Sequence, residues 1–419
     1  MPCLRMGSLY DGPDLRKRPA NPPEAHMNKL ATTIITLGLM ATPGLAQESA
    51  GTSPSISSVG EAMGKCVADR EVAGAVTLVA TPERIAHMDA TGKADIAGAR
   101  AMRPDTIFWI ASMTKPITAT AVMMMQDEGK LSVEDPVEKH LPEFKGLKDR
   151  EGKPVAVTIR HLLTHTSGMA EATPAEARGI KDLAGLMPVY VGKPVQFPPG
   201  SKWAYCQSGI NTAARIVEVA SGMPFDRFLE RRLTGPLGMK DTTFYLNEGQ
   251  VPRLATSYRR GKEGELNATP VSILYGKPPT SRDRFPAANG GLFSTAPDYA
   301  RFCRMILNGG ELDGRRYVKP ESVALMTSVQ TGDLKTGFTP GNGWGLGWAV
   351  TREPQGITAM LSPGTFGHGG AYGTQAWIDP IKKRAYILMI QRADYPNSDA
   401  SPVRKAFQEA AAAALDGSK

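Results

Sequence analysis

The sequence predicts an α/β protein in which both ends of the chain build one sheet and the middle is mainly helical. Near the start of the globular part, β-branched runs at 74–81 and 85–90 predict two strands. Strand-like segments return near the C-terminus, at 344–350, 374–378 and 384–391. Because helical patterns fill the chain between these two groups, we expect an α/β domain with a helical domain inserted into it.

The first 46 residues are predicted to be a leader that ends in a signal peptide. Lys29 supplies a short positive region, 30–40 is apolar, and small residues around Ala46 form a cleavage site. The apolar stretch is too short for a transmembrane helix and is broken by Pro43. We therefore expect a periplasmic or secreted protein, with a signal peptide from about Met27 to Ala46 and no stable membrane insertion after its cleavage. A buried helix of the mature fold is the alternative interpretation.

Helical patterns follow the leader in a regular order. Apolar residues at helical spacing predict helices at 56–72, 117–128, 158–163, 208–220, 224–233, 297–307, 320–326 and 402–415. Residues 247–287 are polar, rich in glycine and proline, and are predicted to be irregular. After the leader, 1–46, we divide the chain into a discontinuous α/β domain, 47–125 and 286–419, and a mainly helical domain, 126–285.

Composition and charge exclude several classes of protein. A hydrophobic content of 41% is sufficient for a packed core, which excludes a disordered or coiled-coil chain. The net charge is +8, but the basic residues are scattered among acidic ones and do not cluster, so we expect no nucleic-acid partner. The four cysteines lie far apart without a CxxC pair, which argues against a zinc site or a disulfide framework. Cys3 belongs to the leader, and we expect Cys66, Cys206 and Cys303 to be free thiols.

The common catalytic motifs are absent, with one exception. The chain has no HExxH, no P-loop and no GxGxxG after a strand, so we expect neither a metal nor an organic cofactor. It also lacks the G-x-S-x-G elbow of α/β-hydrolases. The remaining motif is a single S-x-x-K, formed by Ser112 and Lys115. About one such match is expected by chance in a chain of this length, so the motif alone is weak evidence.

Ser112 and Lys115 are nevertheless suited to nucleophilic catalysis. They lie at the start of a predicted helix, where positions three apart share one face. A serine hydroxyl needs a neighbouring base, and a lysine serves as one only when burial or nearby positive charge lowers its pKa. The helix N-terminus provides a positive field that also favours a developing oxyanion.

The surroundings of this motif resemble a known superfamily. The block from Asp105 to Phe144, followed by TIRHLLTHTSGM, resembles the serine β-lactamases and penicillin-recognising enzymes. Within them it is most similar to the class C β-lactamase-like branch and the family VIII carboxylesterases. The resemblance extends over about 56–415 and implies a β-lactamase/transpeptidase-like fold, with an antiparallel sheet flanked by N- and C-terminal helices. It assigns Ser112 as the nucleophile and Lys115 as its base.

Tyr205-Cys206-Gln207 occupies the place of the Tyr-x-Asn motif of that superfamily. The resemblance implies that Tyr205 is a second general acid or base that shares a proton with Lys115. Gln207 is one methylene longer than the usual asparagine, which puts its hydrogen bond to substrate in doubt. Cys206 is interpreted as a packed residue and not as a nucleophile.

His368-Gly369-Gly370 corresponds to the third motif, Lys-Thr-Gly in β-lactamases and H-x-G or W-x-G in esterases. The resemblance implies an oxyanion hole built from the backbone N–H groups of Ser112 and Ala371, with Gly370 allowing close approach of a ligand. A mostly neutral histidine binds a carboxylate less well than a lysine does. The site should therefore prefer uncharged esters over substrates that carry a carboxylate.

Other polar residues are interpreted as structural. His161 and His165 flank a predicted helix end, and the Ser-Lys-Tyr set already supplies the base. The runs 282–284 and 289–291 could line the rim of a cleft, but we expect solvated loops there.

The sequence thus favours a serine hydrolase that cleaves short-chain carboxylic esters, or β-lactam-like small molecules, through an acyl-enzyme. A β-lactamase or D,D-peptidase/amidase on the same fold is one alternative, and a non-catalytic cell-wall binding protein is another. Oligomeric state is left open.

Overall fold

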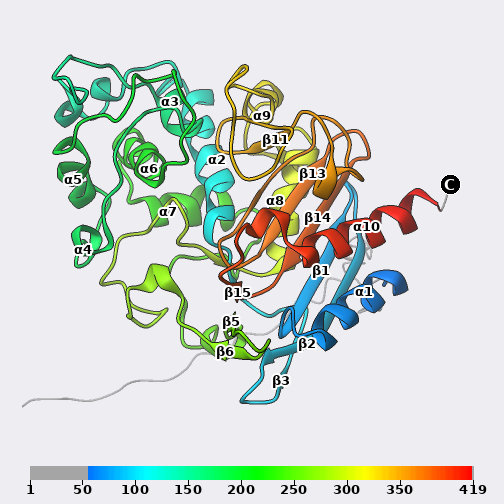
Figure 1. Cartoon of the computed structure of the whole chain (residues 1–419). Helices are drawn as coiled ribbons and strands as arrows, with labels where there is room; N and C mark the ends of the chain where they lie inside the picture. The colour runs from blue at the N-terminus through cyan, green and yellow to red at the C-terminus, as the bar shows by residue number, and fades with distance from the viewer. Residues whose placement is uncertain (1–54, 418–419) are drawn as a thin grey trace, which may run out of the picture. The chain divides into compact units, whose positions relative to one another are not determined.

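An eight-stranded antiparallel sheet joins the two ends of the chain in the part that the computed structural model describes, residues 55–417 (Figure 1). The strand order is β10-β11-β12-β13-β14-β1-β2-β3. Its strands are β1 (Gly74–Ala80), β2 (Ile85–Asp95), β3 (Arg100–Ala101), β10 (Asn342–Trp344), β11 (Ala349–Thr351), β12 (Phe366–Gly369), β13 (Gln375–Asp379) and β14 (Arg384–Met389). The N-terminal β1 pairs with the C-terminal β14, with Val76 opposite Met389. The predicted α/β fold with an antiparallel sheet is confirmed.

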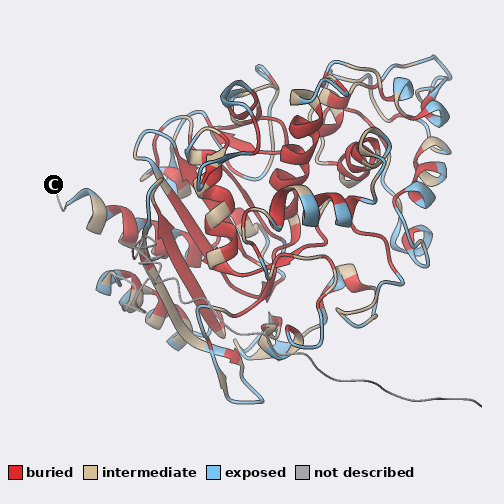
Figure 2. Ribbon diagram, turned by 180° about the vertical axis from the view of Figure 1, so that it is seen from behind, coloured by how far each residue is buried: buried red, intermediate tan, exposed pale blue. Residues whose placement is uncertain are grey.

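Helices cover both faces of this sheet. The longer helices are α1 (Ser57–Ala68), α2 (Thr114–Asp127), α6 (Gln207–Ser221), α8 (Ala296–Leu307), α9 (Pro320–Thr327) and α10 (Pro402–Asp416). The first and last of these, α1 and α10, pack against each other on one face, and α8 packs against β1 and β14 on the other. Every residue of β1 is buried as a result, which explains why the strand is apolar except for Thr77, whose hydroxyl is hydrogen bonded to His87 (Figure 2).

The side chains of β1 alternate between two cores. Val76 and Leu78 belong to the large core that includes Phe302 of α8, whereas Ala75 and Val79 belong to the core beneath α1 and α10. This alternation follows from the two-residue repeat of a strand, with apolar layers on both sides.

The middle of the chain is built from short helices around α2 and α6. They are α3 (Ile159–Leu163), α4 (Pro174–Ala177), α5 (Met187–Val191) and α7 (Phe225–Leu229), which continues into a π-helical turn, Glu230–Thr234. Nearly every side chain of α2 is buried, because α6 packs on one side and α9 and β12 on others. The described residues belong to one compact unit, Thr52–Lys419, so the proposed boundaries at 125/126 and 285/286 stay a prediction.

Several short strands lie outside the main sheet. They are β4 (Phe108–Trp109) with β7 (Phe293–Ser294), β8 (Glu311–Leu312) with β9 (Arg315–Arg316), and β5 (Tyr258–Arg260) with β6 (Leu266–Ala268) and β15 (Arg392–Ala393). Residues 247–287, predicted to be irregular, therefore contain a small hairpin, whose turn uses Gly264 at φ +84°.

One predicted strand is wrong in detail. The segment 344–350 contains the end of β10, a turn at 345–348 and the start of β11, and is not one strand. Gly347 has φ +77°, and a Cβ there would lie too close to Ala119 of α2, so the chain reverses against the helix. The other predicted strands and helices are present with shifted ends: α1 ends at Ala68 and not at 72, β2 continues to Asp95 and not to 90, and α2 begins at Thr114 and not at 117.

The leader and signal peptide predicted for 1–46 lie outside the described residues. In residues 55–417 no helix is long and apolar enough to cross a membrane. Cys66, Cys206 and Cys303 are buried free thiols, as predicted.

Candidate active site

The turn that carries Ser112 leads directly into α2. Ala111, Ser112 and Met113 form a single 3₁₀ turn, and Lys115 follows in the first turn of the helix. Side chains three apart lie above one another in such a turn, which places Lys115 Nζ 3.0 Å from Ser112 Oγ. Ala111 has φ +45°, an unfavourable backbone conformation held by the surrounding structure next to the nucleophile.

Lys115 is placed so that it can act as a base near neutral pH. The side chain is fully buried, and burial lowers its pKa to about 7, although the charge of Glu171 opposes the shift. Its Nζ donates a hydrogen bond of 2.6 Å to the carbonyl oxygen of Asn289 and lies 4.6 Å from the ring centroid of Tyr205. A large fraction of Lys115 is therefore neutral at pH 7 and able to take the proton of Ser112.

Asn289 belongs to the site, and its interpretation as part of a solvated loop was wrong. Besides accepting from Lys115, it donates from Nδ2 to Gln207 Oε1 over 3.0 Å. Its backbone N–H donates to Asn211 Oδ1 of α6 over 3.1 Å, and Trp109 donates to the neighbouring Gly290 carbonyl. The Asn-Gly-Gly run was visible in the sequence, but nothing local in it shows that it folds against α2.

Tyr205 lies at the end of the loop before α6, and its hydroxyl faces β12. Burial raises its pKa above the ordinary range, and the charges of Asp399 and Glu171 add to the rise, while a hydrogen bond with Ser112 opposes it. The phenol thus keeps its proton at neutral pH. The Tyr205 hydroxyl can pass a proton between neighbouring groups, whereas Lys115 is the group that can remove the proton of Ser112.

His368 of β12 is neutral, as expected from the sequence. Burial and the nearby Lys115 lower its pKa to about 3. Nδ1 lies 2.7 Å from the carbonyl oxygen of Gly369, which can only accept, so Nδ1 carries the hydrogen. Nε2 is left as the acceptor for the hydroxyl of Tyr205, 3.3 Å away. The residue aligns Tyr205 and offers no positive charge to a carboxylate.

Two backbone N–H groups are free to bind an oxyanion. Among the described residues, the N–H groups of Ser112 and Ala371 donate to no acceptor. The N–H of Gly370, in contrast, donates to the carbonyl of Thr374 and closes the turn. A Cβ at Gly370 would collide with the carbonyl of Ile110, so only glycine lets this edge approach the turn that carries Ser112.

One cavity of about 360 Å³ brings the predicted residues together. Its lining includes Ser112, Tyr205, Gln207, His368, Gly370 and Ala371. The structure also adds residues that the sequence did not indicate: Phe338 and the segment 395–399. All predicted catalytic and substrate-binding residues except the buried Lys115, which lies behind Ser112, therefore line the same space.

The histidines of the helical region make structural contacts, and their predicted lack of a catalytic role stays a prediction. His161 forms a capping box with Thr158 at the start of α3. His165 is buried, accepts a hydrogen bond of 3.0 Å from the Cys206 N–H at Nδ1, and packs against the Tyr205 ring. Burial raises the pKa of the Cys206 thiol to about 11, so this residue is no nucleophile at neutral pH.

Glu171 is a further residue that the sequence did not reveal. Its carboxylate accepts hydrogen bonds from the backbone N–H groups of Gln207 and Ser208, at the N-terminus of α6. It thereby fixes the start of the helix that follows Tyr205.

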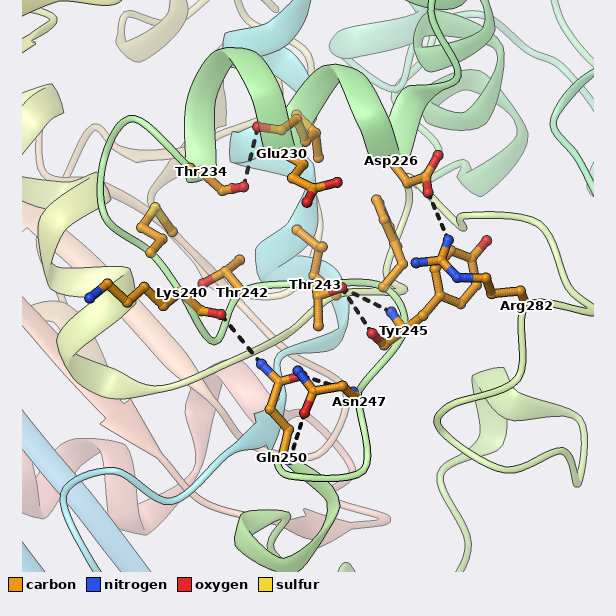
Figure 3. A pocket seen from close by; sticks show the side chains of 15 residues that line it. Asp226, Glu230, Thr234, Lys240, Thr242, Thr243, Tyr245, Asn247, Gln250 and Arg282 are labelled. Carbon is orange, nitrogen blue, oxygen red and sulfur yellow. Dashed lines mark hydrogen bonds and ion pairs between the residues drawn. The ribbon is translucent and has the colours of Figure 1, made fainter. Parts of the chain in front are cut away.

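A second cavity, of about 410 Å³, lies away from the nucleophile (Figure 3). Arg282 lines it, donates to Asp226 over 3.3 Å and stacks on the ring of Tyr245. Figure 3 shows these side chains grouped at one side of the cavity. The run 282–284 therefore does not contribute to the rim of the Ser112 cavity.

The fold and this arrangement define a class: a serine hydrolase of the β-lactamase/transpeptidase-like fold. The Beta-lactamase family matches residues 59–411, and the chain belongs to that family. Similar proteins include Protein Rv1367c of Mycobacterium tuberculosis, 34% identical over 359 residues, which are 79% of this chain and 88% of that protein. Esterase EstB of Burkholderia gladioli is 30% identical over 355 residues, 78% of this chain and 87% of that protein.

Solved structures agree on the fold. EstCE1, described as a hydrolase with promiscuous acyltransferase activity, superposes with a TM-score of 0.73 at 24% identity. The superposition covers 85% of this chain and 97% of EstCE1.

Proposed function

We propose that the protein hydrolyses short-chain carboxylic esters through an acyl-enzyme at Ser112. The observation that carries the proposal is the 3.0 Å contact between Ser112 Oγ and Lys115 Nζ, with the pKa of Lys115 at about 7. A relative named as an esterase, EstB, supports the choice of substrate class.

Each of the site residues has its own role in acyl transfer. Neutral Lys115 accepts the proton of Ser112 as Oγ attacks the ester carbonyl, and the N–H groups of Ser112 and Ala371 hold the oxyanion. Tyr205 donates its proton to the leaving alcohol oxygen and takes the proton of Lys115 in exchange. Water then attacks the acyl carbon while neutral Lys115 takes its proton. The Lys115–Tyr205 pair passes that proton to Ser112 Oγ as the bond between Oγ and the acyl carbon breaks and the acid leaves.

His368 supports the choice of neutral esters over carboxylate-bearing substrates. Its pKa of about 3 leaves it uncharged at neutral pH, so the cavity has no cation at the position of the third motif. A carboxylate entering this space would lose its hydration without gaining an ion pair.

The test is hydrolysis of p-nitrophenyl acetate and butyrate by the purified chain. Ser112→Ala should abolish turnover, and a fluorophosphonate should add to the wild-type chain but not to this variant. Ser328→Ala, at an exposed helix end, is the matched control and should keep both properties. Full activity of Ser112→Ala would place the nucleophile elsewhere.

A β-lactamase or D,D-peptidase/amidase is the second candidate, favoured by membership of the Beta-lactamase family. Nitrocefin hydrolysis that exceeds short-ester hydrolysis would select it. A chain that binds cell-wall fragments yet never reacts with a fluorophosphonate would be a non-catalytic binding protein.

We also propose that the protein acts outside the cytoplasm, on the basis of the signal-peptide pattern at 27–46. N-terminal sequencing of protein from the periplasm or medium should find a chain that begins near residue 47. A chain that begins at residue 1 would contradict this.

A further inference from the structure

A carboxylate lines the active-site cavity and has no part in the mechanism above. Asp399 lies in a short 3₁₀ turn, Ser398–Ala400, just before α10. Its Oδ1 accepts a hydrogen bond of 3.2 Å from Gln375 Nε2, and its Oδ2 accepts none from a described residue. The carboxylate occupies the space that a Cβ on Gly369 would need, so it lies directly over the strand that carries His368.

No cation neutralises this carboxylate from within the cavity. The lining residues include neither lysine nor arginine, and Asp399 forms no ion pair in the part of the chain that the structure describes. Arg404 of α10 is buried behind it, but its Nη1 donates to the backbone carbonyl of Asp399 and its Nε to Gln408. Burial raises the pKa of the Asp399 carboxyl, and the charge of Arg404, whose guanidinium packs on the ring of Trp377, opposes that rise and favours the ionised carboxylate that lines the cavity.

The charge of Asp399 acts on the side of the cavity where the leaving alcohol must lie. In the proposed mechanism the alcohol oxygen receives its proton from Tyr205, so the alcohol lies against that side chain. Asp399 and Glu171 are the two carboxylates whose charges raise the pKa of Tyr205. Glu171 is occupied by the N–H groups of Gln207 and Ser208, which leaves Asp399 as the carboxylate available to a substrate.

We propose that Asp399 makes this site select esters whose alcohol part carries a positive charge, such as esters of amino alcohols. The same carboxylate disfavours esters whose alcohol part carries a carboxylate, because like charges repel more strongly beside partly buried groups than in bulk water. This inference rests on the proposed ester hydrolysis at Ser112. It concerns selectivity and names Asp399 as a specificity-determining residue.

Three acetate esters of similar size test the inference: acetylcholine, its uncharged isostere 3,3-dimethylbutyl acetate, and 3-acetoxypropanoate. In the wild-type chain kcat/KM for the cation should exceed that for the isostere by about tenfold, and the anion should fall about tenfold below it. Asp399→Asn keeps the shape and the bond from Gln375 but removes the charge. This variant should bring both ratios of kcat/KM, cation to isostere and anion to isostere, within about twofold of one.

Asp394→Asn is the matched control. Asp394 lies five positions away on the same segment and pairs with Arg259 on the surface, so its replacement should leave both ratios as in the wild type. Wild-type ratios near one, or ratios that persist in Asp399→Asn, would overturn the inference while ester hydrolysis stands. If the wild-type chain hydrolyses none of the esters faster than Ser112→Ala does, the proposed function fails and the inference falls with it.

A measurement on the wild-type chain decides the matter if Asp399→Asn does not fold. Choline should inhibit hydrolysis of 3,3-dimethylbutyl acetate competitively, at a concentration about tenfold lower than 3,3-dimethylbutanol requires. Equal inhibition by the two alcohols would contradict the selectivity.

Discussion

The two walls of the Ser112 cavity are built in different ways. One wall is local: Ser112 lines the cavity and Lys115 lies behind it, three residues further along the turn that opens α2, and their contact follows from helical geometry. The opposite wall is assembled from distant segments, with His368 on β12 and Asp399 before α10. The first wall holds the groups that break the bond, and the second holds the groups that decide which molecule is placed there. Rate and selectivity should therefore respond separately to mutation.

The largest effect is expected at the local wall. Lys115→Met keeps the length and apolar stem of the side chain but removes the base, so kcat/KM for p-nitrophenyl butyrate should fall by at least about a thousandfold. Lys115→Arg should fail as well, because a guanidinium keeps its proton. Lys405→Met, at an exposed position paired with Glu409, is the control. Retention of a tenth of the activity by Lys115→Met would exclude Lys115 as the base.

Tyr205 lies between the two walls. Its hydroxyl should contribute slightly less to kcat/KM than the amine of Lys115 does. Tyr205→Phe keeps the ring that packs on His165 and removes only the proton donor, so kcat/KM should fall by about a hundredfold or more. Tyr317→Phe is a control for the loss of a phenol elsewhere. An effect on KM alone, with kcat unchanged, would argue for substrate binding in place of proton transfer.

The dependence of kcat/KM on pH should report the protonation state of Lys115 in the local wall. Lys115 is active when neutral, so kcat/KM should rise with pH through about 7 and fall about tenfold for each pH unit below it. His368 and His165 have lowered pKa values and do not titrate in this range. Tyr205→Phe should keep the same acid limb on its residual activity. A flat profile between pH 5 and 8 would show that Lys115 is not the titrating base.

A substitution in the opposite wall should change selectivity more than rate. His368→Lys places a cation at the third motif, so the ratio of nitrocefin to p-nitrophenyl butyrate hydrolysis should rise about tenfold. His368→Gln, which can hydrogen bond but carries no charge, is the matched control and should leave this ratio near that of the wild type. A ratio that falls in His368→Lys would show that carboxylate recognition does not depend on this position.

The smallest effect on catalysis is expected outside both walls. His161→Ala removes one half of the capping box of α3 and should lower the free energy of unfolding by about 1 kcal/mol, measured by urea denaturation. Its kcat/KM should stay within about twofold of the wild type, because His161 does not line the Ser112 cavity. A large loss of activity without loss of stability would assign His161 a catalytic role.

The same contrast explains which features could be predicted. The S-x-x-K spacing indicated the contact of Ser112 with Lys115 before any fold was known, and the motif resemblance indicated Tyr205 and His368. Asn289 and Asp399 were missed as site residues, because their roles depend on contacts with segments far away in the chain. Within the fold, the buried strand β1 was visible as a β-branched run, whereas the β10–β11 turn depends on the packing of Gly347 against α2.

Local patterns in this chain are enough to predict the class of fold and the proximity of Ser112 and Lys115, because helical and strand periodicities act over a few residues, whereas the roles of these two residues came from the motif resemblance. The pKa of Lys115 at about 7, the pKa of His368 at about 3 and the position of Asp399 at the cavity are properties of the folded state alone. They depend on how much water is excluded around each group and on which distant charges face it. Those quantities exist only once α2, β12 and the segment before α10 have packed around one cavity.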